Sequence, residues 1–397
     1  MTLTTPVGSK PQPLPAGALP PGIRSRFVEG VNGLCTHVLE AGYETPGRPC
    51  VLLLHGFPEL AFSWRKILPA LAAAGYHAVA PDQRGYGRTT GWDGAYDTDL
   101  SAFRMMNLVR DAMGLLFALG YRHAACVIGH DFGSPVAAWC ATVRPDVFRS
   151  VVLMSAPFGG PPALPFDTAR ASGARGTSPV DVHAALAALP RPRKHYQWYY
   201  STRAADADMR QAPQGIANFL RAYYHVKSAD WAANRPYPLK AWDAESLALL
   251  PTYYVMDLNQ DMAATVAPEM PEPSEVAACD WLPDTDLQIY AEEFARTGFQ
   301  GGLQWYRCST SGRFHAEHQL YAGRTIDVPS CFIAGRSDWG IHQKPGEFEA
   351  MRDRNLTRML ECKIIDGAGH WVQQEQPHAV TDTLLHFLAE ASRLTSS

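Results

Sequence analysis

The sequence predicts an α/β protein, with a mostly parallel central sheet covered by helices and a second, helical unit inserted into it. Short apolar runs typical of buried strands alternate with stretches of helical periodicity. The alternation stops after Pro157 and resumes near Thr325, and the interval is helical, aromatic and interrupted by prolines. We therefore expect a proline-rich N-terminal arm at residues 1–23, a core formed by residues 24–156 and 325–397, and a helical cap at residues 157–324.

The expected elements follow one another along the chain. Residues 25–42 alternate in polarity around Asn32-Gly33, a dipeptide that favours a tight β-hairpin. Continuous apolar runs are typical of central strands buried on both faces. They occur at residues 51–55, 76–82, 124–130, 150–156, 331–335 and 362–370. Helical patterns separate most of them, at residues 64–74, 101–119, 134–143, 346–353 and 377–393.

Composition and charge exclude several classes of protein. The chain has 397 residues and a net charge of −4, which gives no indication of binding to nucleic acid or to an anionic membrane. We expect no membrane span, no secretory signal, and neither a metal nor an organic cofactor. The eight cysteines are scattered and form no ligand motif, which predicts reduced thiols in a cytoplasmic protein. A homo-oligomer is compatible with these features.

Residues 126–139, "CVIGHDFGSPVAAW", combine an apolar run, a glycine-flanked turn and a helical pattern. This layout is typical of a nucleophile elbow, a sharp turn that needs small residues such as Gly129 and Gly133 on either side. Asp131 stands where serine would be expected, and the start of the helix behind it favours an anion. The backbone N–H groups of Phe132 and of Phe57 in "HGFP" are expected to form an oxyanion hole.

Two further residues complete a catalytic set with this aspartate. His370 follows the last strand through "DGAG", and Asp338 in "AGRSDWG" follows the strand before it. The carboxyl ends of parallel strands meet at one edge of a sheet, so the three side chains are expected to lie together. Asp338 would orient the imidazole of His370 through its Nδ1 atom.

A carboxylate nucleophile changes the reaction that such a set performs. It is already ionised at neutral pH and can displace a leaving group at saturated carbon, which forms an ester on Asp131. His370 would then activate the water that hydrolyses the ester. The leaving group is either a halide or the oxygen of a strained epoxide. Phe132 has no side-chain donor for a halide, whereas the cap contains many tyrosines that suit epoxide opening.

From about residue 24 onward, the chain resembles the epoxide hydrolases of the α/β-hydrolase fold, of the soluble and microbial type. The resemblance rests on "HGFPELAFSWRKILPALAAAGYHAVAPDQRGYGRT" and "GHDFGSPVAAW". "GFQGGLQWYR" is similar to the cap segment that ends in one ring-opening tyrosine, which implies Tyr306 for that role. "HYQWYYSTRAADADM" resembles the segment that carries the other, which implies Tyr196, with Tyr199 or Tyr200 as alternatives. No cofactor is implied.

The sequence therefore predicts an enzyme that adds water to a small apolar epoxide and releases a vicinal diol. Trp64, Trp198 and Trp371 are candidates for an apolar pocket wall, and ordinary core packing is an equally good interpretation of each. The alternatives are a dehalogenase that acts on haloalkanes or haloacids with the same aspartate, and a catalytically silent protein that binds a ligand through the hydrolase fold. The identity of the epoxide and the role of the long cap insertion at residues 227–271 stay open at this stage.

Overall fold

A computed structural model describes residues 11–164 and 181–395 of the chain. The first ten residues of the expected N-terminal arm and residues 165–180 of the expected cap lie outside the described part. The rest of the arm lies against the core, where Leu19 and Ile23 are buried.

The described part contains an eight-stranded sheet in the order β1-β2-β4-β3-β5-β6-β9-β10. The pairs β1/β2 and β2/β4 are antiparallel and the other pairs are parallel. The strands are β1 (Arg24–Val31), β2 (Leu34–Ala41), β3 (Cys50–Leu54), β4 (His77–Pro81), β5 (Cys126–His130), β6 (Val151–Met154), β9 (Ser330–Gly335) and β10 (Met359–Ile365). Strands β3 to β6 are buried at every position, which explains their continuous apolar sequences. The predicted α/β fold is confirmed.

Local sequence accounts for the hairpin at the edge of this sheet. Strands β1 and β2 turn at Asn32 and Gly33, which have φ values of 49° and 82°. Both values lie in the left-handed region that asparagine and glycine tolerate best. The predicted hairpin at this dipeptide is therefore correct.

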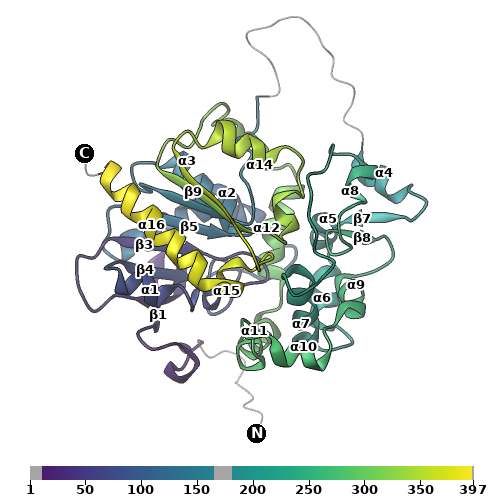
Figure 1. Cartoon of the computed structure of the whole chain (residues 1–397), viewed down its shortest axis with the longest axis horizontal. Helices are drawn as coiled ribbons and strands as arrows, with labels where there is room; N and C mark the ends of the chain where they lie inside the picture. Colours follow the sequence, from purple (N-terminus) through teal and green to yellow (C-terminus); the bar gives the residue numbers. More distant parts are fainter. Residues whose placement is uncertain (1–10, 165–180, 396–397) are drawn as a thin grey trace, which may run out of the picture.

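Helices pack on both faces of the sheet (Figure 1). Helices α2 and α3 pack against each other on one face, and α1 and α16 lie on the other. The helices that belong to the core around this sheet are α1 (Leu68–Ala73), α2 (Met105–Ala118), α3 (Gly133–Val143), α14 (Glu347–Ala350), α15 (Val372–Glu375) and α16 (Pro377–Thr395). Where one helix was expected at residues 64–74, the chain forms a 3₁₀ turn, η2 (Ala61–Trp64), followed by the short α1. Pro69 occupies the first turn of α1, a position that proline favours.

The segment between β6 and β9 forms a second layer beside the carboxyl ends of the strands (Figure 1). It is not entirely helical, because it contains a two-stranded antiparallel sheet of β7 and β8. Its described elements are α4 (Val182–Ala187), β7 (Arg193–His195), α5 (Tyr196–Tyr200), α6 (Ala205–Arg210), α7 (Ile216–Lys227), α8 (Ala244–Leu247), β8 (Val255–Asp257), α9 (Met262–Val266), α10 (Pro273–Ala278), α11 (Asp284–Thr297), α12 (Gln300–Thr310) and α13 (His315–Gln319). No helix in the described residues has the length and hydropathy needed to cross a membrane.

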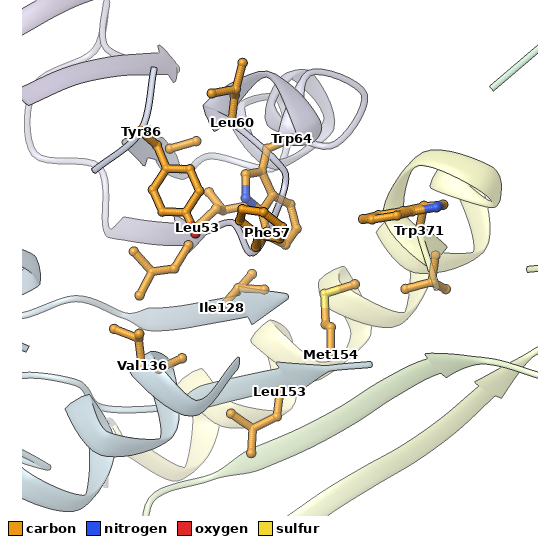
Figure 2. Packing of buried hydrophobic residues seen from close by; sticks show 14 of the residues in the cluster. Leu53, Phe57, Leu60, Trp64, Tyr86, Ile128, Val136, Leu153, Met154 and Trp371 are labelled. Atoms are coloured by element: carbon orange, nitrogen blue, oxygen red, sulfur yellow. The ribbon is translucent and has the colours of Figure 1, made fainter. Parts of the chain in front are cut away.

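Aromatic side chains fill the space beside the ends of the central strands (Figure 2). Phe57 and Trp64 lie close to Leu53 and Ile128, and each is at most 1% exposed. Burying a large aromatic side chain stabilises a fold by roughly 2–3 kcal/mol. This packing holds the loop after β3 in place, and that loop borders the candidate site.

Candidate active site

Asp131 lies on a strained turn between β5 and α3. Its φ of 51° is in the left-handed region, which is uncommon for a residue with a side chain. The turn is sharp enough that a Cβ on Gly129 would lie 2.0 Å from the carbonyl oxygen of Gly133. A Cβ on Gly133 would in turn lie 2.3 Å from the carbonyl oxygen of Leu54. Both glycines are therefore required sterically, as the elbow pattern predicts.

The loop after β3 approaches the same carboxylate from the other side. The backbone N–H of Phe57 donates a hydrogen bond of 2.8 Å to Oδ1 of Asp131. A Cβ on Gly56 would lie 2.3 Å from that side chain, so this loop position also requires glycine. The ring of Phe132 packs against Trp305 and Tyr306, and all three line the same cavity as Asp131.

The structure brings His370 and Asp338 to this turn. The Nε2 atom of His370 lies 3.1 Å from Oδ2 of Asp131, and its Nδ1 lies 3.1 and 3.2 Å from the two carboxylate oxygens of Asp338. The Asp338 carboxylate also accepts a 2.7 Å hydrogen bond from the N–H of Gly340, because Asp338 is the cap of a 3₁₀ turn, η5 (Trp339–Ile341). Each of the three residues is at most 9% exposed. The arrangement places an imidazole between two carboxylates.

Electrostatics in this buried set favour ionised carboxylates. Burial by itself raises the pKa of Asp131, but the hydrogen bond and charge of His370, with the charges of Lys227 and His130, hold that pKa well below its ordinary value. The pKa of Asp338 is lowered for similar reasons, since His370 outweighs the effect of burial. Burial and Lys227 lower the pKa of His370, but the two carboxylates outweigh them and raise it to about 9. The site therefore favours an ion cluster with a protonated imidazole.

Two tyrosines of the inserted layer face Asp131. Tyr196 and Tyr306 line the same cavity as the carboxylate, and their ring centroids are 6.0 Å apart. The Tyr196 hydroxyl donates to Oε1 of Gln343 at 3.2 Å and accepts from Nε2 of Gln197 at 3.1 Å. Burial and the nearby charge of Asp131 raise the pKa of both phenols well above the ordinary value, so both hydroxyls keep their protons at neutral pH.

The alternative tyrosines point elsewhere. The hydroxyl of Tyr199 donates to Asp208 at 2.9 Å, and the hydroxyl of Tyr200 donates to Tyr223 at 3.1 Å. Neither of the two lines the cavity that contains Asp131. This placement favours Tyr196 as the partner of Tyr306.

The cavity next to Asp131 has a volume of about 800 Å³. Its wall is formed by α3, by residues 156–163, by α12 and α13, and by residues 340–347. Trp139, Phe158 and Phe314 make part of this wall apolar. A cavity of this size accommodates a substrate of drug-like dimensions.

The three tryptophans expected in the pocket wall do not line this cavity. Trp64 and Trp371 are fully buried, and the indole N–H of Trp371 donates to the carbonyl of Tyr224 at 2.8 Å. Trp198 packs against His183 and His195 in the inserted layer. Their placement agrees with the packing interpretation, whereas Trp139 lines the cavity next to Asp131. The sequence carries no signal that separates a tryptophan of the cavity wall from a tryptophan of the core, since both stand in apolar surroundings.

A second ion pair behind the site was missed at the sequence level. The Oε2 atom of Glu59 lies 2.6 Å from Nδ1 of His130, and Nε2 of His130 donates to the carbonyl oxygen of His370 at 2.7 Å. Glu59 also accepts from the N–H of Gly56 at 3.0 Å. The pair joins the loop after β3 to the His370 loop. The sequence signals for this pair were Glu59 in "HGFPE" and His130, which directly precedes Asp131. In the described residues, no group of three or more His, Cys, Asp or Glu is arranged to hold a metal ion.

Comparison with known proteins identifies the family. Residues 49–377 match the family described as alpha/beta hydrolase fold. Epoxide hydrolase A of Mycobacterium tuberculosis is 34% identical over 360 residues, which cover 90% of this chain and 95% of that protein. The chain belongs to the epoxide hydrolases of the α/β-hydrolase fold. An epoxide hydrolase of Caballeronia sordidicola is 30% identical, over 92% of this chain and 94% of that protein.

Solved structures of epoxide hydrolases share this architecture. An epoxide hydrolase from an endophytic Streptomyces superimposes with a TM-score of 0.73 at 31% identity, over 93% of this chain and 96% of the other. Epoxide hydrolase A from Mycobacterium thermoresistibile gives a TM-score of 0.70 at 33% identity, over 92% of this chain and 98% of the other. The predicted resemblance to this family is therefore confirmed.

Proposed function

We propose that this epoxide hydrolase converts an apolar epoxide into a vicinal diol through a covalent ester on Asp131. One observation carries the proposal. The Asp131 carboxylate accepts from the N–H of Phe57 on one oxygen and contacts Nε2 of His370 with the other, in a cavity that also contains Tyr196 and Tyr306. A nucleophile, a base for water and two proton donors thus meet at one point.

In the first half-reaction, Oδ2 of Asp131 attacks an epoxide carbon while Oδ1 keeps its hydrogen bond to Phe57. The carbon–oxygen bond of the ring breaks, and the oxygen takes a proton from one of the two phenols. Tyr196 and Tyr306 suit this step because their raised pKa values keep them protonated until the alkoxide develops. The product is an alkyl ester of Asp131 with a free hydroxyl on the neighbouring carbon.

In the second half-reaction, Nε2 of His370 removes a proton from water, and the resulting hydroxide adds to Cγ of the ester. The N–H groups of Phe57 and Phe132 stabilise the oxyanion, and Asp338 stabilises the imidazolium. Collapse breaks the ester bond, the leaving alkoxide takes the proton from His370, and the diol departs. Asp131 is left as a carboxylic acid, and it releases its proton to solvent while the phenolate takes one back, which restores the free enzyme.

A single turnover in ¹⁸O-labelled water tests this route. Excess enzyme is mixed with styrene oxide, and the diol and the peptide that contains Asp131 are weighed by mass spectrometry. We expect unlabelled diol and one ¹⁸O atom in the Asp131 carboxylate, because water attacks the ester rather than the epoxide. Labelled diol in the first turnover would show that water opens the epoxide directly and would overturn the ester route.

The same preparation separates the alternatives from the proposal. A dehalogenase would release halide from a haloalkane such as 1-chlorohexane, and a silent binding protein would turn over neither substrate. We expect no halide above the level of Asp131→Asn, since Phe132 offers no side-chain donor to a departing halide.

We further propose that residues 157–324 act as a cap on a core formed by residues 24–156 and 325–397. The positions of β6 and β9 on either side of the inserted layer support this division. A cytoplasmic location is proposed because all eight cysteines are free. Cell fractionation tests the location, and limited proteolysis between the layers tests the division.

A further inference from the structure

Lys227, the last residue of α7, has no role in the two half-reactions, yet its side chain lies beside the catalytic set. It is 3% exposed, and in the described part of the chain no carboxylate oxygen lies within 4 Å of its ammonium group. Burying an ammonium without a direct partner is costly, so a position of this kind calls for a compensating interaction. One feature of the site supplies it, and a second feature ties Lys227 to the loop of His370.

The first feature is a cage of four aromatic rings. The distances from Nζ of Lys227 to the ring centroids are 4.9 Å for Tyr254, 5.2 Å for Tyr223, 5.7 Å for Trp371 and 5.8 Å for Tyr253. Aromatic faces within about 6 Å attract a cation. The cage thus fixes the position of the ammonium as well as stabilising it.

The second feature is a direct link to the base. The backbone N–H of His370 donates to the carbonyl oxygen of Lys227 at 2.8 Å, so the same residue holds the His370 loop through its main chain. Asn234 secures this end of α7, because its amide donates to the carbonyls of Val226 and Ser228 at 2.8 and 2.7 Å. The oxygen of that amide accepts from Tyr253 of the cage at 2.8 Å.

Among the groups that act most strongly on His370, the charges balance only when Lys227 is counted. Asp131, Asp338 and Lys227 act most strongly on the imidazole, and the ring of His130, which is paired with Glu59, is tilted to it with the centroids 5.1 Å apart. Glu375 accepts from the N–H groups of Gly369 and Trp371 on either side of His370, and burial raises the pKa of Glu375 to about 7. In the free enzyme, two carboxylates are balanced by the imidazolium and the ammonium. Formation of the ester removes the charge of Asp131, which leaves one cation in excess.

We propose that Lys227 is a positioning residue whose caged ammonium drives the proton off His370 once the ester has formed. Release of a proton from His370 to bulk water removes the excess positive charge. It also leaves the neutral imidazole that the second half-reaction needs. The ammonium and the carboxylate of Asp338 remain as a balanced pair. This proposal rests on the proposed function, because it requires the ester on Asp131.

Rapid-quench kinetics of Lys227→Met test the proposal, with ester formation and ester hydrolysis measured separately as functions of pH. The variant keeps the backbone carbonyl and much of the side-chain volume but removes the charge. We expect ester formation to persist and the midpoint for ester hydrolysis to rise by about one pH unit, which slows hydrolysis about tenfold below the midpoint. An unchanged midpoint would overturn the proposal.

Two further variants separate charge from packing. Lys227→Arg keeps the positive charge, so its pH midpoint for ester hydrolysis should equal that of the wild type. If the midpoint shifts equally in Lys227→Met and Lys227→Arg, packing rather than charge is responsible. Lys194→Met is the matched control, because Lys194 lies over the ring of Tyr199 at 4.9 Å in the inserted layer, and we expect no shift from it. Titration of His370 by ¹⁵N NMR in the free Lys227→Met enzyme gives a second readout, and its pKa should rise above the wild-type value.

Failure of this proposal is distinguishable from failure of the proposed function. If the wild type forms no ester, the ester mechanism is wrong. If the wild type forms the ester and Lys227→Met hydrolyses it with the wild-type pH profile, only the role of Lys227 is wrong.

Discussion

Asp131 and His370 are 239 residues apart in the chain, and Nε2 of His370 lies 3.1 Å from Oδ2 of Asp131. Their loops follow β5 and β10, which end at the same edge of the sheet. The contact places the base against the carboxylate before substrate binds. In the proposed mechanism, the same nitrogen activates water once that carboxylate has become an ester.

Replacement of Asp131 by asparagine should remove ester formation. A neutral amide is a far weaker nucleophile than a carboxylate, so we expect the rate of diol formation to fall by at least about a thousandfold. Steady-state assays of freshly purified Asp131→Asn measure this effect, with mass spectrometry to exclude deamidation back to aspartate. Asp382→Asn, on an exposed position of α16, is the matched control and should keep full activity. Full activity in stable Asp131→Asn would contradict the assignment.

Loss of the base should trap the intermediate. We expect His370→Asn to form the ester and then hydrolyse it roughly a hundredfold to ten-thousandfold more slowly than the wild type. Intact-mass spectrometry after mixing with substrate should show one substrate added per enzyme molecule. Asp338→Asn should give a similar, weaker accumulation because the imidazole loses its orienting carboxylate. Equal slowing of both half-reactions, without accumulation, would argue against His370 as the base for water.

The two cavity tyrosines should act in ring opening. We expect Tyr196→Phe and Tyr306→Phe each to slow ester formation by roughly tenfold to a hundredfold, and the double variant to lose nearly all of it. Stopped-flow fluorescence under single-turnover conditions measures this step. Tyr199→Phe is the control, since its hydroxyl is bonded to Asp208 and does not line the cavity. A larger loss in Tyr199→Phe than in Tyr196→Phe would reverse the assignment.

Ester hydrolysis should depend on pH more than ester formation does. The pKa of His370 is raised to about 9 in the free enzyme, and ester formation removes the raising effect of Asp131, so the pKa of the intermediate lies below that value. Hydrolysis needs the neutral imidazole and should therefore slow as the pH falls through this lower pKa. Ester formation should stay nearly constant from about pH 5 to about pH 9, because Asp131 is ionised and the phenols are protonated throughout. A pH-independent hydrolysis rate over this range would contradict the role of His370.

The cavity should limit the size of the substrate. Ser309 lies on the exposed wall of the cavity, and a tryptophan there would fill part of its volume. We expect Ser309→Trp to lower kcat/KM for 1,2-epoxydodecane by roughly tenfold, and to leave that for 1,2-epoxybutane nearly unchanged. Ser311→Trp is exposed and outside the cavity wall, and it serves as the control. Equal effects on both epoxides would show that this part of the cavity does not hold substrate.

The strands, the elbow and the positions of Asp131, Asp338 and His370 could be predicted from the sequence because each depends on local rules. Burial on both faces requires continuous apolar strands, and the turn at Asp131 requires Gly129 and Gly133 on steric grounds. Each of the three polar residues also lies within five residues of the end of a recognisable strand. Such features leave a pattern within a few residues of sequence.

Only the tertiary structure decided which aromatic residues serve the site and which ones pack. Tyr196 faces the cavity while Tyr199 bonds to Asp208, although both lie on the same short helix, and Trp139 lines the cavity while Trp64 does not. The Lys227 cage and the Glu59–His130 pair likewise join elements far apart in the chain. The sequence by itself determined the fold and the sharp turn that presents Asp131, because backbone sterics and burial periodicity act locally. Contacts between distant segments depend on how the layers pack, and they leave no periodic trace in the sequence.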